Sequence, residues 1–312
     1  MTQFTYGVDI SKAHLDVFRL PDGACRRFVY DKAGLKAFVR WLGAEPVERI
    51  VYEPTGRYHR SFEACMAKAG FPLSKVNPRQ ARRFAEAAGR LAKTDRVDAQ
   101  MLAKMGQALK PGLYTPLSSE LADMRELLTA RRALIKDLTA AKNRSEGLWI
   151  ALLKRQNAAR RKQSEDQIQA IDAELRDRIA ASETLKARFD ILLSIPGIGV
   201  TAALCLLIDM PELGALENKQ AAALMGVAPM TRQSGTRPAR AAIKGGRYNL
   251  RHSIYMPALV ACRYNPDFKA LYERLVTAGK PPKVAIIAVL RKITILANVL
   301  LKKNTKWTKM GA

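Results

Sequence analysis

The chain has 312 residues, more than one hydrophobic core usually organises, and 48% of them are hydrophobic, which predicts two folded domains and a connecting element. Lysine and arginine outnumber aspartate and glutamate by 53 to 28, and the net charge of +25 favours a polyanionic partner, nucleic acid first. The longest apolar run, residues 284–301, is interrupted by Arg291 and Lys292, so we expect a buried helix and no membrane partner.

Two further features narrow the class of protein. Residues 1–11 lack the charged and apolar regions of a secretion signal, so we expect a cytoplasmic protein. The four cysteines are far apart and form no CxxC pair, which argues against a disulfide framework and a cysteine zinc site. We interpret them as small core residues.

The N-terminal third alternates between strand and helix patterns. Short β-prone runs cover residues 4–10, 15–20 and 25–30, with a Pro-Asp-Gly turn before the third. After them the sequence predicts helix, strand, helix, strand and helix over residues 31–42, 48–53, 58–69, 71–76 and from 78 onward. Asp31 is the expected cap of the first helix, and the last helix carries Arg79, Arg82, Arg83 and Arg90. This order of elements is typical of an RNase H-like fold.

The middle of the chain reads as long helices. From residue 118 to about 153 the pattern predicts one continuous helix with heptad-like apolar spacing, which Arg131 interrupts. A very basic link, residues 155–162, precedes a second helix with Ile168, Ile171, Leu175 and Ile179 on its apolar side. We expect an antiparallel coiled-coil arm that packs either on itself or on another subunit.

The C-terminal part begins at the sequence SIPGIG, residues 194–199. This motif followed by an alanine-rich helix resembles a helix-hairpin-helix, in which backbone N–H groups approach a phosphate; a simple turn between two core helices is the alternative. The rest is helical and basic, except for a polar stretch over residues 230–249. The expected domains are residues 1–112, 113–190 and 191–312.

Four carboxylates can meet in the N-terminal domain. Asp9 lies on the first strand and Glu53 at the end of the fourth, and these strands are neighbours in an RNase H-like sheet. Asp95 and Asp98 are three residues apart and share one helix face. Clustered carboxylates repel one another unless cations neutralise them. Two magnesium ions about 4 Å apart would do so and would catalyse phosphoryl transfer.

Each of these acidic residues also has a simpler interpretation. Thr94 can cap a helix, and Asp95 and Asp98 then only favour the positive end of that helix. Asp9 can be a strand-end turn residue, and Glu53 a surface acid. Taken together with the order of strands and helices, the four residues favour the metal site.

A candidate nucleophile lies in the polar stretch. Ser234 follows Thr231-Arg232-Gln233 and precedes a glycine, but no histidine triad accompanies it, so a turn residue is its simplest interpretation. A metal-held phosphate would supply the missing activation. Ser253 is the alternative hydroxyl, within a predicted helix. The candidate nucleic-acid-binding residues, or alternatively a solvated basic face, are Lys12, Arg232, Arg237, Arg240, Lys244, Arg247 and Arg251.

Several motifs together resemble one known family. GVDISK, YEPTGRY, VNP and KTDRVDAQMLA, with GVAP, RQSG, KGGRYNLR and YMPALVA further on, resemble the DEDD insertion-sequence transposases, which include the Piv-type DNA invertases and the bridge-RNA-guided recombinases. The resemblance covers almost the whole chain. It implies an N-terminal RNase H-like (RuvC-like) domain whose tetrad is Asp9, Glu53, Asp95 and Asp98.

The resemblance also implies an activity. In the family's C-terminal helical transposase domain a serine before glycine attacks DNA and becomes a phosphoserine, and Ser234 matches that position. It further implies magnesium, DNA partners at insertion-sequence ends and target, a structured guide RNA, and a homodimer or homotetramer. The main rival is a hydrolytic nuclease of the Holliday-junction resolvase type that uses the carboxylates alone. A nucleic-acid-binding scaffold without activity is the second alternative.

Overall fold

The computed structural model describes residues 3–56, 58–90, 94–234 and 237–308, and in the segments 232–234 and 237–240 it describes the backbone alone. The chain divides into two compact units, residues 1–118 and residues 119–312. We call them unit 1 and unit 2 and describe each by itself. The expected division into three domains at residues 112 and 190 remains a prediction.

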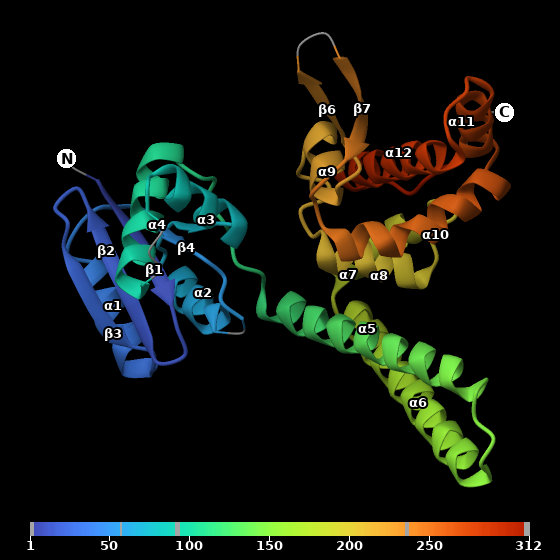
Figure 1. Ribbon diagram of the computed structural model, residues 1–312, viewed down its shortest axis with the longest axis horizontal. Coiled ribbons are helices and arrows are strands. Elements are labelled where there is room, and N and C mark those ends of the chain that lie inside the picture. Colours follow the sequence, from blue (N-terminus) through green and yellow to red (C-terminus); the bar gives the residue numbers. More distant parts are fainter. Residues whose placement is uncertain (1–2, 57, 91–93, 235–236, 309–312) are drawn as a thin grey trace. The chain divides into compact units, whose positions relative to one another are not determined.

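Unit 1 is built around a mixed sheet of five strands within its described residues. These strands are β1 (Phe4–Ile10), β2 (His14–Leu20), β3 (Cys25–Val29), β4 (Val47–Tyr52) and β5 (Leu73–Lys75). Their order in the sheet is β3-β2-β1-β4-β5, with β1 antiparallel to β2 and parallel to β4 (Figure 1). The five expected strands are therefore present, in the order of an RNase H-like sheet.

The four helices described in unit 1 are α1 (Lys32–Leu42), α2 (His59–Lys68), α3 (Pro78–Ala87) and α4 (Asp95–Leu109). Three of them, α1, α3 and α4, begin after a residue whose side chain caps them. The Asp31 side chain accepts a hydrogen bond from the Gly34 N–H at 2.7 Å, so it caps α1 as expected. The expected extension of α3 to Arg90 is wrong, because Gly89 adopts a left-handed conformation, with φ of 74°, just beyond the end of this helix.

The two faces of the sheet carry different residues because side chains alternate along each strand. Tyr6, Val8 and Ile10 of β1 belong to a core cluster with residues of α1 and α2. Gly7 faces the opposite side, where α4 lies along β1 and β2 (Figure 1). Asp9 has the same parity as Gly7, so it lies on the α4 face.

Small residues let α4 approach the sheet closely. A Cβ atom on Gly7 would lie 2.0 Å from the carbonyl oxygen of Ala99 and 2.3 Å from the nitrogen of Ala103. At the other end of the helix, a Cβ on Gly106 would lie 2.5 Å from a methyl carbon of Val51. The backbone of β1 at Gly7 is thus in direct contact with the backbone of α4, and this contact fixes where α4 begins relative to the sheet.

Unit 2 opens with a helical hairpin formed by α5 (Ser119–Ser145) and α6 (Ala151–Ala181) (Figure 1). The expected continuous helix to residue 153 is wrong, because the chain reverses over residues 146–150, which include Gly147, a poor helix former. The basic segment 155–162 is no link but part of α6. Lysine and arginine are good helix formers, and most of the side chains of this segment are exposed.

The two helices of the hairpin pack on each other through a seam with an apolar part and a charged part. Met124 and Leu128 of α5 are buried in the same cluster as Leu175 and Ile179 of α6. Further along, Arg131 donates two hydrogen bonds to Asp172 at 2.6 and 3.0 Å. Arg131 thus interrupts the apolar seam because an acid faces it on α6.

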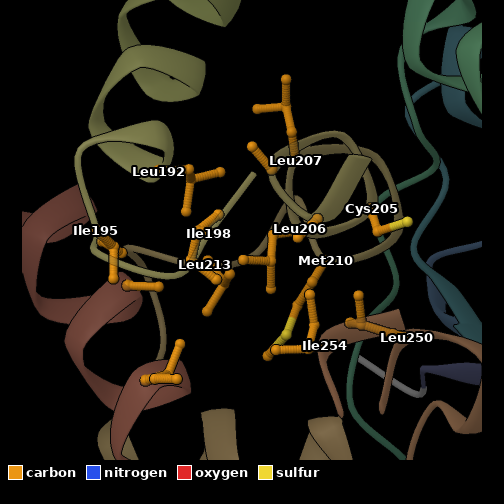
Figure 2. Packing of buried hydrophobic residues seen from close by; sticks show 14 of the residues in the cluster. Leu192, Ile195, Ile198, Cys205, Leu206, Leu207, Met210, Leu213, Leu250 and Ile254 are labelled. Atoms are coloured by element: carbon orange, nitrogen blue, oxygen red, sulfur yellow. The ribbon is translucent and has the colours of Figure 1, made fainter. Parts of the chain in front are cut away.

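The remaining helices of unit 2 surround a large apolar core. They are α7 (Glu183–Leu193), α8 (Val200–Asp209), α9 (Asn218–Met225), α10 (Tyr248–Tyr264), α11 (Pro266–Thr277) and α12 (Pro282–Lys303). Figure 2 shows side chains from α7, α8 and α10 converging in this core. By length and composition α12 is apolar enough to cross a membrane, but nine of its residues are buried inside unit 2, as expected of a core helix.

Two features of unit 2 refine the expectations. The SIPGIG segment joins α7 to α8, with Ile195 and Ile198 buried in the core and Gly197 in a left-handed conformation against Ala261 of α10. The polar stretch contains a hairpin, β6 (Pro229–Ser234) and β7 (Arg237–Ile243), where no strands were expected. Within the described residues its two strands form a separate two-stranded sheet, so no apolar alternation marks them in the sequence.

We expected all four cysteines to be core residues, and this is wrong for two of them. Cys205 and Cys262 are buried, but Cys25 is exposed at the start of β3, and Cys65 is half-buried. β3 is the edge strand of the sheet, and most of its side chains are exposed.

Candidate active site

The first two candidate carboxylates lie at the carboxyl ends of adjacent strands, Asp9 as the second-last residue of β1 and Glu53 directly after β4. Val8 of β1 pairs with Tyr52 of β4 in parallel register, so the next residues, Asp9 and Glu53, are neighbours at the carboxyl end of this strand pair. Val51 packs with Leu102 and Met105 of α4, and Glu53 shares its parity. Both acids therefore belong to the α4 face of the sheet.

The other two carboxylates begin the helix that covers this face. Asp95 and Asp98 lie in the first turn of α4, and the hydroxyl of Thr94 caps it by accepting from the Val97 N–H at 3.4 Å. The cap that was considered as an alternative is therefore real, and it coexists with the cluster. Glu53 and Asp98 line the same pocket. The contact of α4 with Gly7 brings this helix end beside Asp9.

Asp9 is the centre of the acidic cluster. Its pKa is raised from 3.8 to about 6, first by burial of the carboxyl and then, in decreasing order, by the charges of Asp95, Asp98, Asp16 and Glu53. The three other acids of the expected tetrad, Asp95, Asp98 and Glu53, thus each act on Asp9. Such repulsion destabilises the folded chain unless positive charge compensates it.

Two residues of the cluster escaped the sequence analysis. Asp16 of β2 is paired with Asp9 across the antiparallel ladder and is buried. Arg27 of β3 holds it with two hydrogen bonds of 2.9 and 3.0 Å and lies 3.7 Å from Asp95. The signal was available, because Asp16 stands between the apolar Leu15 and Val17, where a strand that pairs with β1 would present it beside Asp9.

The donor chemistry of the cluster fits a divalent cation. Carboxylate oxygens are the ligands that hard cations such as Mg²⁺ prefer. Within the described residues, no three of these acids are close enough together to surround one ion. The carboxylates thus lie around Asp9, but the described residues do not form a complete coordination sphere for one ion.

A buried polar network anchors the segment that carries Glu53. The hydroxyl of Tyr52, immediately before Glu53, donates to Glu63 of α2 at 2.6 Å. Lys75 of β5 approaches the same carboxylate at 2.8 Å. The network ties β4, α2 and β5 together beside the β4 end, and therefore restricts the position of Glu53.

The candidate serine lies in unit 2. Ser234 is the last residue of β6, and its backbone pairs with Arg237 of β7. The side chains of Arg232, Ser234, Arg237 and Arg240 are outside the described part of the structure. Ser253, the alternative hydroxyl, lies in α10 and donates to the carbonyl of Asn249 at 2.9 Å.

The other expected nucleic-acid-binding residues differ in their surroundings. Lys12, between β1 and β2, and Lys244, after β7, are exposed. Arg247 makes two hydrogen bonds to Glu212, of 2.6 and 2.8 Å, and Arg251 donates to the carbonyls of Gly226 and Gly245. The last two residues thus have structural partners within unit 2.

Comparisons with known proteins identify the family. Residues 6–177 match a transposase family of the DEDD type named after IS110, and residues 189–273 match the family described as Transposase IS116/IS110/IS902. The chain is 27% identical to the pilin gene-inverting proteins of Moraxella bovis and of Moraxella lacunata, over 99% of each chain. It is 31% identical to an uncharacterized 42 kDa protein of insertion element IS900 from Mycobacterium paratuberculosis, over 40% of this chain and 33% of that protein.

Proposed function

The chain belongs to the IS110 family of DEDD transposases, enzymes that act on DNA, and we propose that it cleaves and rejoins DNA strands by metal-dependent phosphoryl transfer through Ser234. The observation that carries the proposal is the gathering of acids around Asp9, whose pKa is raised to about 6 by burial and by the charges of these acids. A family of this type uses divalent metal, and an acidic cluster of high mutual repulsion is suited to binding cations.

Asp9, Glu53, Asp95 and Asp98 are the residues proposed to hold the metal, which we take to be two magnesium ions. When bound, magnesium would polarise the scissile phosphate and stabilise the oxygen that leaves it. The acids themselves bind and orient the cations, and Arg27 keeps Asp16 ion-paired so that its charge is partly neutralised. Salt-paired Asp16 is therefore not assigned as a ligand.

Ser234 is the proposed nucleophile. Its Oγ forms a bond to the phosphorus of the scissile phosphodiester, its proton passes to solvent, and the bond to one DNA oxygen breaks, which leaves a hydroxyl on that strand end. In the reverse sense, a DNA hydroxyl attacks the phosphoserine and frees Ser234. The phosphodiester bond energy is retained in the protein–DNA bond, so rejoining needs no external energy source.

The remaining partners complete the proposal. The proposed substrates are insertion-sequence ends and target DNA, with a structured guide RNA, and the net charge of +25 suits such polyanions. Lys12, Lys244 and the arginines of the β6–β7 region would contact phosphates, as would the SIPGIG turn if it acts as a helix-hairpin-helix. The α5–α6 hairpin would join protomers in a homodimer or homotetramer, in the cytoplasm.

The first test compares Ser234→Ala with Ser253→Ala. Each purified variant is incubated with magnesium, candidate guide RNA and end-labelled insertion-end DNA, and denaturing gels reveal protein–DNA adducts. We expect the adduct in the wild type and in Ser253→Ala, and a loss of at least about a hundredfold in Ser234→Ala, because the attacking atom is removed. Asp9→Asn is expected to lose both adduct and cleavage.

Two other results would contradict parts of the proposal, the first the serine mechanism and the second the metal site. Cleavage at the wild-type rate in Ser234→Ala, without an adduct in any variant, would support the hydrolytic nuclease that uses the carboxylates alone. Cleavage by Asp9→Asn, or cleavage that persists in EDTA, would refute the metal site.

A further inference from the structure

Unit 1 has an open pocket of roughly 430 Å³ beside the acidic cluster, between α3 and α4. Two of the proposed metal-binding acids, Glu53 and Asp98, line it. The α3 side of the pocket carries three arginines, Arg79, Arg82 and Arg83. Negative and positive side chains thus share a single cavity, and both come from unit 1.

The three arginines are not equally available to a ligand. Arg82 is ion-paired with Glu86 one turn away, at 3.1 Å. Arg79 and Arg83 are exposed, and neither makes an ion pair within the described part of the chain. They are four residues apart, so their side chains lie on the same side of α3.

The stability of α3 does not explain why these cations are present. Arginines near the positive N-terminus of a helix oppose its dipole, and the first turn of α3 contains no acid to offset them. The helix start itself offers little to an anion, because Pro78 has no N–H and the N–H of Arg79 donates to the Asn77 side chain at 2.9 Å. The guanidinium groups are therefore the anion-binding feature of this wall.

A DNA strand that reaches the acidic cluster needs compensating positive charge, because its phosphates are repelled by Asp9, Glu53, Asp95 and Asp98. We propose that Arg79 and Arg83 bind a backbone phosphate of the strand whose neighbouring phosphate lies at the acidic cluster. Guanidinium groups bind phosphate oxygens in pairs and without regard to base sequence. This inference rests on the proposed function, since it takes a phosphodiester strand as the ligand.

The test measures binding without cleavage. Labelled DNA of two unrelated sequences is titrated with protein in EDTA at several salt concentrations, for the wild type, Arg79→Gln, Arg83→Gln and the double variant. We expect the slope of log K against log salt to fall by about 1 for each arginine removed, equally for both sequences. The matched control is Arg40→Gln, an exposed arginine in the last turn of α1 outside the pocket, for which we expect no change.

Three further variants separate charge from folding. Replacing both arginines by lysine keeps the charge, so the slope should be retained. Glu86→Gln removes a negative charge from the same wall, so binding should become tighter. Melting curves of every variant should match the wild type, because Arg79 and Arg83 are exposed. An RNA probe of the same length distinguishes a guide strand from DNA, and a slope loss seen with RNA alone would overturn the assignment to DNA.

If both glutamine variants and the lysine variant show the wild-type slope of log K against log salt, the inference is overturned. That result would not contradict the proposed cleavage and adduct formation. Conversely, a wild-type protein that binds with the expected slopes but never cleaves in magnesium would contradict the proposed function and not this site.

Discussion

At the scale of single residues, the protonation of Asp9 affects both the stability of unit 1 and its capacity to bind a cation. The Asp9 pKa of about 6 means that, between pH 3.8 and 6, the folded chain binds more protons at this position than the unfolded chain does. Stability from this group is therefore present at low pH and is lost as the pH rises through 6. The site opposes folding under the conditions in which a cation could bind it.

Asp9→Asn should therefore lose activity and gain stability. In EDTA we expect the melting temperature of Asp9→Asn to equal that of the wild type at about pH 4. At about pH 8 it should exceed that of the wild type by a few degrees, because only the wild type acquires the buried charge. Differential scanning fluorimetry over this pH range measures the effect. Glu45→Gln, an exposed acid of unit 1, is the control and should show no pH-dependent gain. A lower melting temperature for Asp9→Asn at high pH would contradict the repulsion argument.

At the scale of elements, the packing of α4 on β1 builds the site. Helix and strand approach so closely at Gly7 that no side chain fits there. The contact sets the height of α4 above the sheet, and the first turn of this helix carries Asp95 and Asp98. Gly7 therefore acts on the acidic cluster through α4 without facing a substrate.

Gly7→Ala should push α4 away from the sheet. We expect a destabilisation of about 1–3 kcal/mol, because the added methyl overlaps backbone atoms that cannot rotate away. The magnesium concentration needed for half-maximal cleavage should rise, because two of the four acids move. Gly112→Ala is the matched control, since a Cβ there meets nothing within 4 Å, and it should be neutral. Urea unfolding and metal titrations provide the measurements, and equal results for both variants would refute the packing argument.

At the scale of the whole molecule, the two units have separate hydrophobic clusters, and the carboxylates and Ser234 belong to different units. A cation bound by the four acids would stabilise unit 1 by mass action, since the unfolded chain lacks the site. The four acids that would hold it all belong to unit 1, and none of them belongs to the core of unit 2.

Hydrogen exchange with and without magnesium should show this difference. We expect slower exchange in the first turns of α4 and at the ends of β1 and β4, and unchanged exchange in α8 and α12. The stabilisation amounts to about 2.7 kcal/mol at a hundredfold excess of cation over its dissociation constant. Asp9→Asn should abolish the slowing. Protection confined to unit 2 would place the cation elsewhere in the chain.

Local sequence patterns predicted unit 1 well because its elements are short and locally encoded. Short β-prone runs marked the strands of the sheet, and caps such as Asp31 marked helix starts. The arm was predicted less well. Charge in residues 155–162 suggested a link, whereas arginine and lysine are compatible with a solvated helix. The β6–β7 hairpin was missed because its strands, within the described residues, form a separate two-stranded sheet and carry no core pattern.

By itself the sequence determined the order of strands and helices in unit 1, the family and the four acidic candidates, because these depend on local pattern and motif. Only the tertiary structure brought Asp16 and Arg27 to the cluster and placed Glu53 and Asp98 in one pocket with Arg79 and Arg83. The raised pKa of Asp9 likewise depends on the tertiary structure. Burial and Coulomb repulsion depend on distances between residues far apart in the chain, and the packing of α4 against Gly7 sets those distances.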